Sequence, residues 1–173
     1  MSITAEELLQ RYAAGERDFT EIQLADTNLR EIDLSGANLS RANLRGSNLY
    51  GANLRGVNLS EANLWLATLH SADLSGSNLR GAILRDTTFD YGYLRGAILE
   101  RADLRNASLS EVDLSGANFE GANLRNASLL GAGLIKTNFR NADLQGVNMA
   151  EAVLEGANFE GANLDGAVYE DDI

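Results

Sequence analysis

The sequence predicts an all-β solenoid, and three observations on its 173 residues support that prediction. A large apolar residue returns at every fifth position from Phe19 to Leu164, at thirty sites that hold twenty-four Leu, five Phe and Met149. In a second column, two positions before the next site of the first, Ala fills nineteen of thirty positions from Ile22 to Ala167, and the others are Gly, Ser, Thr, Val or Ile. The period runs without insertion, deletion or proline.

A period of five fits neither an α-helix nor a flat strand. A helix turns by about 100° per residue, so a five-residue step leaves no apolar face. Side chains of a strand alternate between two faces, so an odd step sends successive Leu side chains to opposite sides. The pattern works when each pentapeptide is a short extended piece followed by a bend, because the Ala-type residue and the Leu then both point inward. Such a chain winds into a solenoid with four short sides per coil, or a close relative of it.

Two columns of residues favour four sides, and therefore twenty residues per coil. Phe119, Phe139 and Phe159 recur at a spacing of twenty. Glycine fills six of seven sites in another such column, from Gly36 to Gly156, as expected for a corner that needs a permissive backbone. Thirty pentapeptides then make about 7.5 coils, and a rod roughly 36 Å long at a spacing of about 4.8 Å between paired strands.

The repeat, written A-(N/D)-L-x-x, resembles the pentapeptide-repeat family over residues 18–169. The resemblance implies a right-handed quadrilateral β-helix in which the Leu, Phe and Ala-type residues fill the core and the other three residues face outward. The segment "LLQRYAAGERDF", residues 8–19, is similar to the leader of cyanobacterial members.

Residues 1–17 are predicted to form a capping helix and a turn, with the helix over residues 4–14. Thr4 and Glu7 have the spacing of a capping box, and Gly15 suits the position that ends a helix. An apolar stripe on this helix is formed by Leu8, Leu9 and Tyr12. We expect the helix to lie over the first coil, because the open edge of a solenoid invites association.

Repeats over residues 18–169 and an acidic tail at residues 170–173 complete the predicted organisation. The net charge of −11 is concentrated at the two ends, since residues 34–140 hold nine acids and eleven bases. Acidic ends repel one another, so we expect a monomer. The acidity also argues against direct nucleic-acid binding, which depends on Lys and Arg meeting phosphates.

Composition excludes several classes of site and location. Without Cys the chain has no disulfide, thiolate zinc site or cysteine nucleophile. No stretch approaches the roughly 18 apolar residues that a membrane span needs. The N-terminus lacks the basic and apolar regions of a signal peptide, so we expect a soluble cytoplasmic protein without membrane contact.

Neither a metal, a cofactor nor catalysis is predicted. The Asn and Asp residues between the two inward positions are expected to hydrogen-bond to the backbone at the bends. The alternative, a calcium site, would need the Gly-rich nonapeptides of a β-roll. His70, Ser71 and Asp73 lie on a convex surface, whereas catalysis needs a concave site. His70 also lies one coil below Asp90, in register for a contact.

Outward columns of Trp, Tyr and Arg give the candidate site. One corner carries Arg45, Trp65, Arg85, Arg105 and Arg125 in successive coils, with Leu66 beside Trp65. The next side carries Tyr50, His70 and Tyr91, with Tyr93 just beyond. Trp, Tyr and Arg are enriched in the binding hot spots of proteins. The alternative is a ladder of Arg side chains stacked on one indole, with scattered surface aromatics that need no explanation.

The sequence therefore predicts a non-enzymatic scaffold, regulatory or protein-interaction module with an unidentified protein partner. The alternative is a DNA mimic that inhibits or protects a type II topoisomerase, DNA gyrase, because some bacterial members of the family do this. This chain differs from them, since no loop interrupts its repeats, no C-terminal dimer helix is present and its middle is not acidic.

Overall fold

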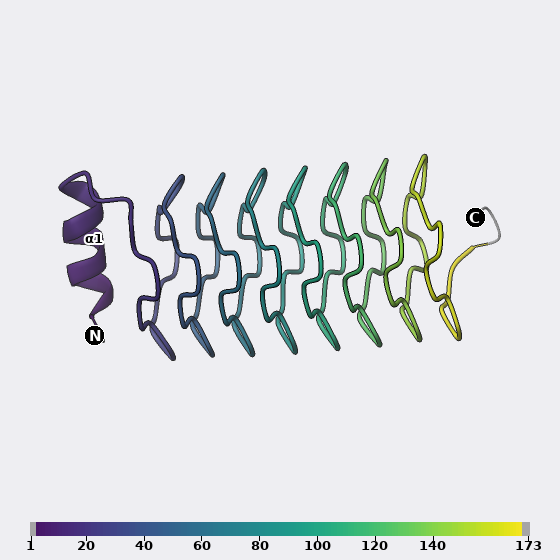
Figure 1. Cartoon of the computed structure of the whole chain (residues 1–173), viewed down its shortest axis with the longest axis horizontal. Coiled ribbons are helices and arrows are strands. Elements are labelled where there is room, and N and C mark those ends of the chain that lie inside the picture. The colour runs from purple at the N-terminus through teal and green to yellow at the C-terminus, as the bar shows by residue number, and fades with distance from the viewer. Residues whose placement is uncertain (1–2, 171–173) are drawn as a thin grey trace.

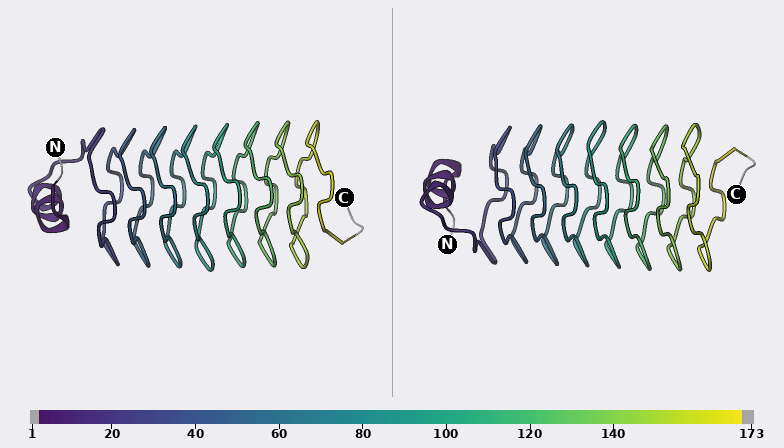
Figure 2. Two further views of the ribbon diagram at one scale, coloured as in Figure 1. Left: turned by 90° about the horizontal axis from the view of Figure 1, so that it is seen from below. Right: turned by 90° about the horizontal axis from the view of Figure 1, so that it is seen from above.

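A computed structural model describes residues 3–170 and shows a rod of stacked coils with helix α1 across one end (Figure 1). Beyond α1, twenty-seven isolated parallel β-bridges each join a residue to the one twenty positions later, from Asp18↔Asn38 to Asn148↔Val168. A coil therefore has twenty residues and four bridged positions, which confirms the predicted coil length; the count of 7.5 coils stays a prediction. Figure 2 shows the same stack from two further sides.

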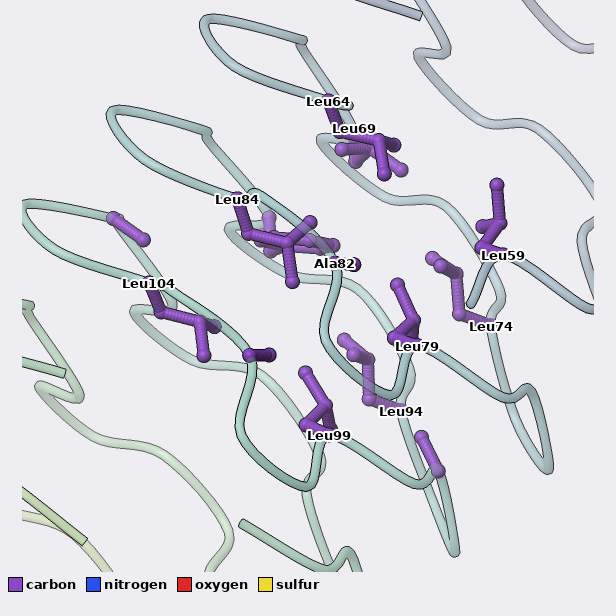
Figure 3. Close-up of a cluster of buried hydrophobic side chains, with 14 of the residues drawn as sticks. Leu59, Leu64, Leu69, Leu74, Leu79, Ala82, Leu84, Leu94, Leu99 and Leu104 are labelled. Atoms are coloured by element: carbon purple, nitrogen blue, oxygen red, sulfur yellow. The ribbon is translucent and has the colours of Figure 1, made fainter. Parts of the chain in front are cut away.

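The interior of the rod holds the two inward columns that the period predicts. Each Leu, Phe or Met site from Phe19 to Met149 is 2% exposed or less. Figure 3 shows Leu64, Leu84 and Leu104 at equivalent places in successive coils. Burying one such side chain contributes about 1.5–3 kcal/mol. The predicted Phe column also stacks, with ring centroids of Phe119 and Phe139 5.1 Å apart.

The bends of the rod have the form of type II turns. At twenty-eight of the thirty bends the Ala-type N–H donates to the carbonyl of the Leu-type residue three positions earlier, as Ala42 does to Leu39 at 3.0 Å. The residue before the Ala-type position has a positive φ at all thirty bends from Glu21 to Gly166, and sixteen of these residues are not glycine. The prediction that one glycine column marks a special corner was therefore too narrow, since all four corners use the left-handed region.

The Asn and Asp residues at the centres of the sides bond locally, as predicted. Asn43 Oδ1 accepts from the N–H of Arg45 at 3.3 Å, and Asp73 Oδ1 accepts from the N–H of Ser75 at 2.9 Å. Some amides also join coils, because Asn58 Nδ2 donates to Asn38 Oδ1 at 3.0 Å. The Asn and Asp residues at the side centres are therefore explained by their hydrogen bonds to the backbone at the bends and to the side chains of neighbouring coils.

Helix α1 spans Ala5–Ala13, one residue inside each predicted boundary. Thr4 Oγ1 accepts from the N–H of Glu7 at 3.1 Å, which confirms the predicted N-cap. Gly15 has a φ of 96°, which confirms its role after the helix end. Of the predicted acidic tail, only Glu170 lies within the described residues.

One face of α1 packs on the first coil. Leu8 is fully buried, and the hydroxyl of Tyr12 donates to the carbonyl of Ser35 at 2.9 Å. Leu9 was wrongly placed in the buried stripe, because it is 44% exposed. Residues four apart share a helix face, whereas Leu9 is rotated about 100° from Leu8. In the part of the chain that is described, no helix is long and apolar enough to cross a membrane.

Candidate functional site

The first part of the candidate site is a corner built from five successive coils. The N–H groups of Gly46, Leu66 and Asp86 donate to the carbonyls of Trp65, Arg85 and Arg105 at 2.8, 3.1 and 3.0 Å. These bonds stack the bends of Arg45, Trp65, Arg85, Arg105 and Arg125 in the predicted register. We refer to this column as the Trp65 corner.

The indole of Trp65 is held on two sides and open on the rest. The guanidinium of Arg45 lies 4.8 Å from the indole centroid, and Trp65 Nε1 donates to Asp86 Oδ2 at 3.1 Å. A cation over an exposed ring contributes roughly 0.5–1 kcal/mol. The side chain of Trp65 remains 39% exposed. The ring is therefore held in one orientation and is still accessible to a partner.

The other arginines of this corner differ in their pairing. Arg105 donates from Nε to Asp103 Oδ1 at 2.8 Å, and these side-chain hydrogen bonds lower the pKa of the Asp103 carboxyl. Arg125 lies 3.6 Å from Asp143. Arg85 forms no ion pair with the residues described here. Of the alternative interpretation, a ladder of Arg side chains stacked on one indole, the described residues show only the stack of Arg45 on Trp65.

The neighbouring corner carries a stacked row of rings, which we name the Tyr50 corner. The guanidinium of Arg30 lies 4.3 Å from the centroid of Tyr50, whose ring stacks on His70 at 5.5 Å. Tyr91 meets the imidazole edge to face at 5.4 Å. The register was also compatible with a contact between His70 and Asp90. The Asp90 carboxylate instead accepts from the N–H of Ser110 at 3.0 Å.

The side that joins the two corners is short and carries small polar residues. Its centre positions are bridged from coil to coil through Asn48, Thr68 and Thr88. Three extended residues span about 10 Å, so a single partner surface can reach both corners. Tyr93 lies on the following side, 52% exposed.

Sequence reasoning missed the residues that extend this site. Ile83 is 41% exposed on the side before the Trp65 corner, and Ile98 is equally exposed on a further side. One coil thus has Ile83, Thr88, Tyr93 and Ile98 at its four side centres, where most coils have Asn or Asp. This interruption of the polar column is readable in the sequence. The contact between Trp65 and Asp86 is not, because it depends on side-chain direction.

Two members of the site have a strained backbone. Leu66 and Tyr91 have φ values of 61° and 60° and are 48% and 60% exposed. Among the sixteen non-glycine residues at such bends, they are the two with large apolar or aromatic side chains. An L-residue in this region costs about 1–2 kcal/mol, and backbone strain of this kind clusters at functional sites. We call Trp65, Leu66 and Tyr91, which lie on the two neighbouring corners, the aromatic patch; Ile83 and Tyr93 flank it on the sides before and after.

The aromatic patch lies on the convex surface of the rod. Two cavities, of about 230 and 340 Å³, lie instead at its ends. The first is lined by residues of α1 and the first coil, including Arg11 and Phe19, and the second by residues such as Leu154 and Glu155. A convex apolar corner suits contact with a macromolecule, because a small ligand is held in a concave site.

A chain that winds in twenty-residue coils with four bridged sides is a β-solenoid of four-sided coils. The chain belongs to the pentapeptide-repeat family, because the family signature described as Pentapeptide repeats matches it in 8 copies, over residues 18–56, 47–86, 87–126 and 132–168. Proteins of this family form right-handed quadrilateral β-helices, which confirms the fold class predicted from the sequence. No catalytic role is identified for the chain.

Solved structures of the same family resemble the chain. A pentapeptide-repeat protein from the thylakoid lumen of Arabidopsis thaliana is 34% identical, with 59% of this chain and 71% of that chain covered and a TM-score of 0.58. HetL, involved in heterocyst differentiation regulation in the cyanobacterium Nostoc, is 32% identical over 100% of this chain and 99% of its own, with a TM-score of 0.33.

A third similar structure is that of QnrB1, a plasmid-mediated fluoroquinolone resistance protein. It is 17% identical and has a TM-score of 0.62, with 90% of this chain and 86% of that chain covered. At this identity the likeness concerns the fold alone. Comparison with curated proteins gives no match.

Proposed function

We propose that this protein is a non-catalytic interaction module that binds another protein through the aromatic patch. The concentration of exposed apolar side chains is the observation that supports this function most directly. Of the eleven large apolar side chains exposed within residues 3–170, Trp65, Leu66 and Tyr91 lie on two neighbouring corners, and Ile83 and Tyr93 lie on the sides that flank these corners. Apolar side chains gathered in one region of a soluble protein mark interaction sites more often than scattered ones do.

The fold does not require these residue types at these positions. Elsewhere the left-handed position of the bend holds Gly or a polar residue (Asn, Asp, Glu, Arg, Lys or Ser), which tolerates the left-handed region or stays solvated. Leu66 and Tyr91 instead combine backbone strain with exposure of apolar surface to water. Both costs are offset when a partner covers the side chains, and aromatic anchors of this kind carry much of the energy of an interface.

Charge indicates the kind of partner surface. Residues 41–110 contain eight bases and six acids, whereas residues 111–173 contain three bases and eleven acids. Arg45 and Arg85 lie one coil to either side of Trp65. We infer a partner that is apolar at its centre and acidic around it, because complementary charges steer association and fix register. A DNA mimic needs a continuous negative face, and this part of the rod is net positive.

A quantitative capture experiment tests the proposal. The tagged protein and its Trp65→Ala/Arg85→Ala variant are incubated with lysate of the source cells, and captured proteins are compared by mass spectrometry. We expect one specific partner whose recovery falls at least tenfold, because a hot-spot aromatic carries roughly 2 kcal/mol or more of an interface. Thermal melting should change little, since these side chains lie outside the core.

The matched control is Leu130→Ala/Lys136→Ala, which removes one apolar and one basic side chain from coils outside the aromatic patch. This variant should capture the partner like the wild type. The DNA-mimic alternative predicts a different outcome, in which the partner is lost on neutralising Asp90, Glu111 and Asp113 and kept by the Trp65→Ala/Arg85→Ala variant. Equal capture by all variants would show that the aromatic patch is not the binding surface.

We propose further that the protein acts as a monomer in the cytoplasm, because its acidic ends oppose self-association. One similar protein comes from the thylakoid lumen. Localisation of a tagged chain in the source cells tests whether this protein is cytoplasmic.

A further inference from the structure

The two ends of the rod are built differently (Figure 1). At the N-terminal end, α1 covers the first coil, and Phe19 is only 2% exposed. At the other end, the inward side chains of the last described coil are half-buried: Ala152, Leu154, Phe159, Leu164 and Ala167. Their counterparts one coil earlier, Leu134, Phe139 and Leu144, are fully buried.

The backbone of this last coil has unused donors. Phe139 and Leu144 donate their N–H groups to the carbonyls of Asn158 and Asn163 at 2.7 and 2.8 Å. The equivalent N–H groups of Phe159 and Leu164 have no acceptor among the described residues. Free edge groups of this kind pair with an added strand, and recognition by strand addition combines backbone bonds with pockets for alternate side chains.

A column of aromatic rings ends at the same surface. Phe119 stacks on Phe139 at 5.1 Å, and Phe139 stacks on Phe159 at 5.2 Å. Among the described residues, the outer face of the Phe159 ring has no further ring of the column stacked on it. A large apolar side chain placed there would contact Phe159 on one side. A segment that continues the coil would place such a side chain there, because stacked coils repeat at about 4.8 Å.

The rim of this end is acidic at every corner. The four bends of the last coil carry Glu151, Glu155, Glu160 and Asp165, and residues 141–170 contain no base. Of these four acids, only Glu160 has an ion pair with a described residue, Arg140, at 3.1 Å. A second copy docked by the same end would bring two such rims together. A second copy docked by its N-terminal end would place α1, with Glu6 and Glu7, against the rim. Like charges disfavour both arrangements.

We propose that this end of the rod binds a basic polypeptide segment, which winds over it as one further coil. Its backbone pairs with the edge of the last coil, its apolar side chains at every fifth position cover Leu154, Phe159 and Leu164, and its Lys or Arg side chains meet the acidic rim. The surface is separate from the aromatic patch, so the two sites can be tested independently.

The test uses residues 1–173 and a fluorescent peptide of four Ala-Asn-Leu-Lys-Gly repeats. Fluorescence anisotropy should show saturable binding, and amide exchange at Phe159 and Leu164 should slow in the complex. Binding should weaken at least tenfold in the exposed Glu155→Lys/Asp165→Lys variant. A peptide with Glu in place of Lys should not bind.

The control variant Glu111→Lys/Glu120→Lys makes the same charge change away from the end and should bind like the wild type. Several binding results would overturn the proposal. They are absence of binding by the Lys peptide, an equal loss in both charge-reversed variants, and amide protection elsewhere along the rod. Sedimentation that shows end-to-end dimers lost in Glu155→Lys/Asp165→Lys would identify a second copy as the occupant and would also overturn it.

Discussion

Two coils of the rod, residues 81–100 and residues 121–140, bury similar side chains and expose different ones. The first has Leu84 and Phe89 inside, and the second has Leu124 and Phe139, all of them fully buried. At the side centres the first coil carries Ile83, Thr88, Tyr93 and Ile98, and the second carries Asn123, Ser128, Gly133 and Asn138. The backbone bridges run through both coils without interruption.

The comparison separates what the fold needs from what the surface is free to vary. Inward positions meet the inward residues of the coils above and below, so their size and polarity are restricted in every coil. Outward positions meet mainly water, and many residue types are neutral there. A coil that departs from the common polar pattern only on the outside is therefore the place to look for a binding site.

The largest expected effect tests whether the two interiors are equivalent. Leu84→Asp and Leu124→Asp should each destabilise the rod by at least about 4 kcal/mol, because an unpaired carboxylate would be buried among apolar side chains. Circular dichroism melts should show both variants unfolded or melting far below the wild type. If one variant melted normally, the two coils would not share one kind of core.

The interior of the rod could be predicted from the sequence because a Leu at every fifth residue points inward only when each short extended piece is followed by a bend. The coil length, the Phe stack and the N-cap at Thr4 all followed from spacing and residue type. The prediction that Leu9 belongs to the buried stripe was wrong, because the sequence alone does not say which face of a short helix meets the rod.

The surface was less accessible to prediction. Register alone placed Trp65 beside Arg45 and Tyr50 beside His70, and the structure shows both contacts. The pairing of Arg105 with Asp103, and the lack of an ion pair between Arg85 and the described residues, depend on side-chain rotamers, which no period encodes. Whether the aromatic patch binds a partner stays a prediction, since surface geometry alone does not identify a ligand.

A smaller effect is expected at one bend that the two coils form with different residues. Tyr91 and Gly131 occupy equivalent bends, with φ values of 60° and 65°. Gly131→Ala should destabilise the rod by at least about 1 kcal/mol, because an L-residue is unfavourable there and its Cβ would lie 2.8 Å from Glu111 Oε1, so the Glu111 side chain must move. Tyr91→Gly should not destabilise the rod. It should raise the free energy of unfolding by up to about 1 kcal/mol, and the loss of the contact with His70 should reduce this gain. Melting temperatures that fall equally would show that Tyr91 is not strained.

The smallest effect is expected for an outward charge. Arg80 Nη1 lies 3.4 Å from Glu100 Oε2, with the Arg80 side chain 56% exposed. Pairs in this setting contribute about 0–1 kcal/mol, because solvent screens the charges and two long side chains lose freedom. Glu100 also accepts from Asn118 Nδ2 at 2.9 Å, so it keeps a partner when Arg80 is removed. Arg80→Ala should therefore change the stability by less than about 0.5 kcal/mol. Arg140→Ala, which removes an exposed pair with Glu160 at the end of the second coil, should give the same small change. A fall in melting temperature comparable to that of Leu84→Asp would contradict the assignment of these positions to the outside of the rod.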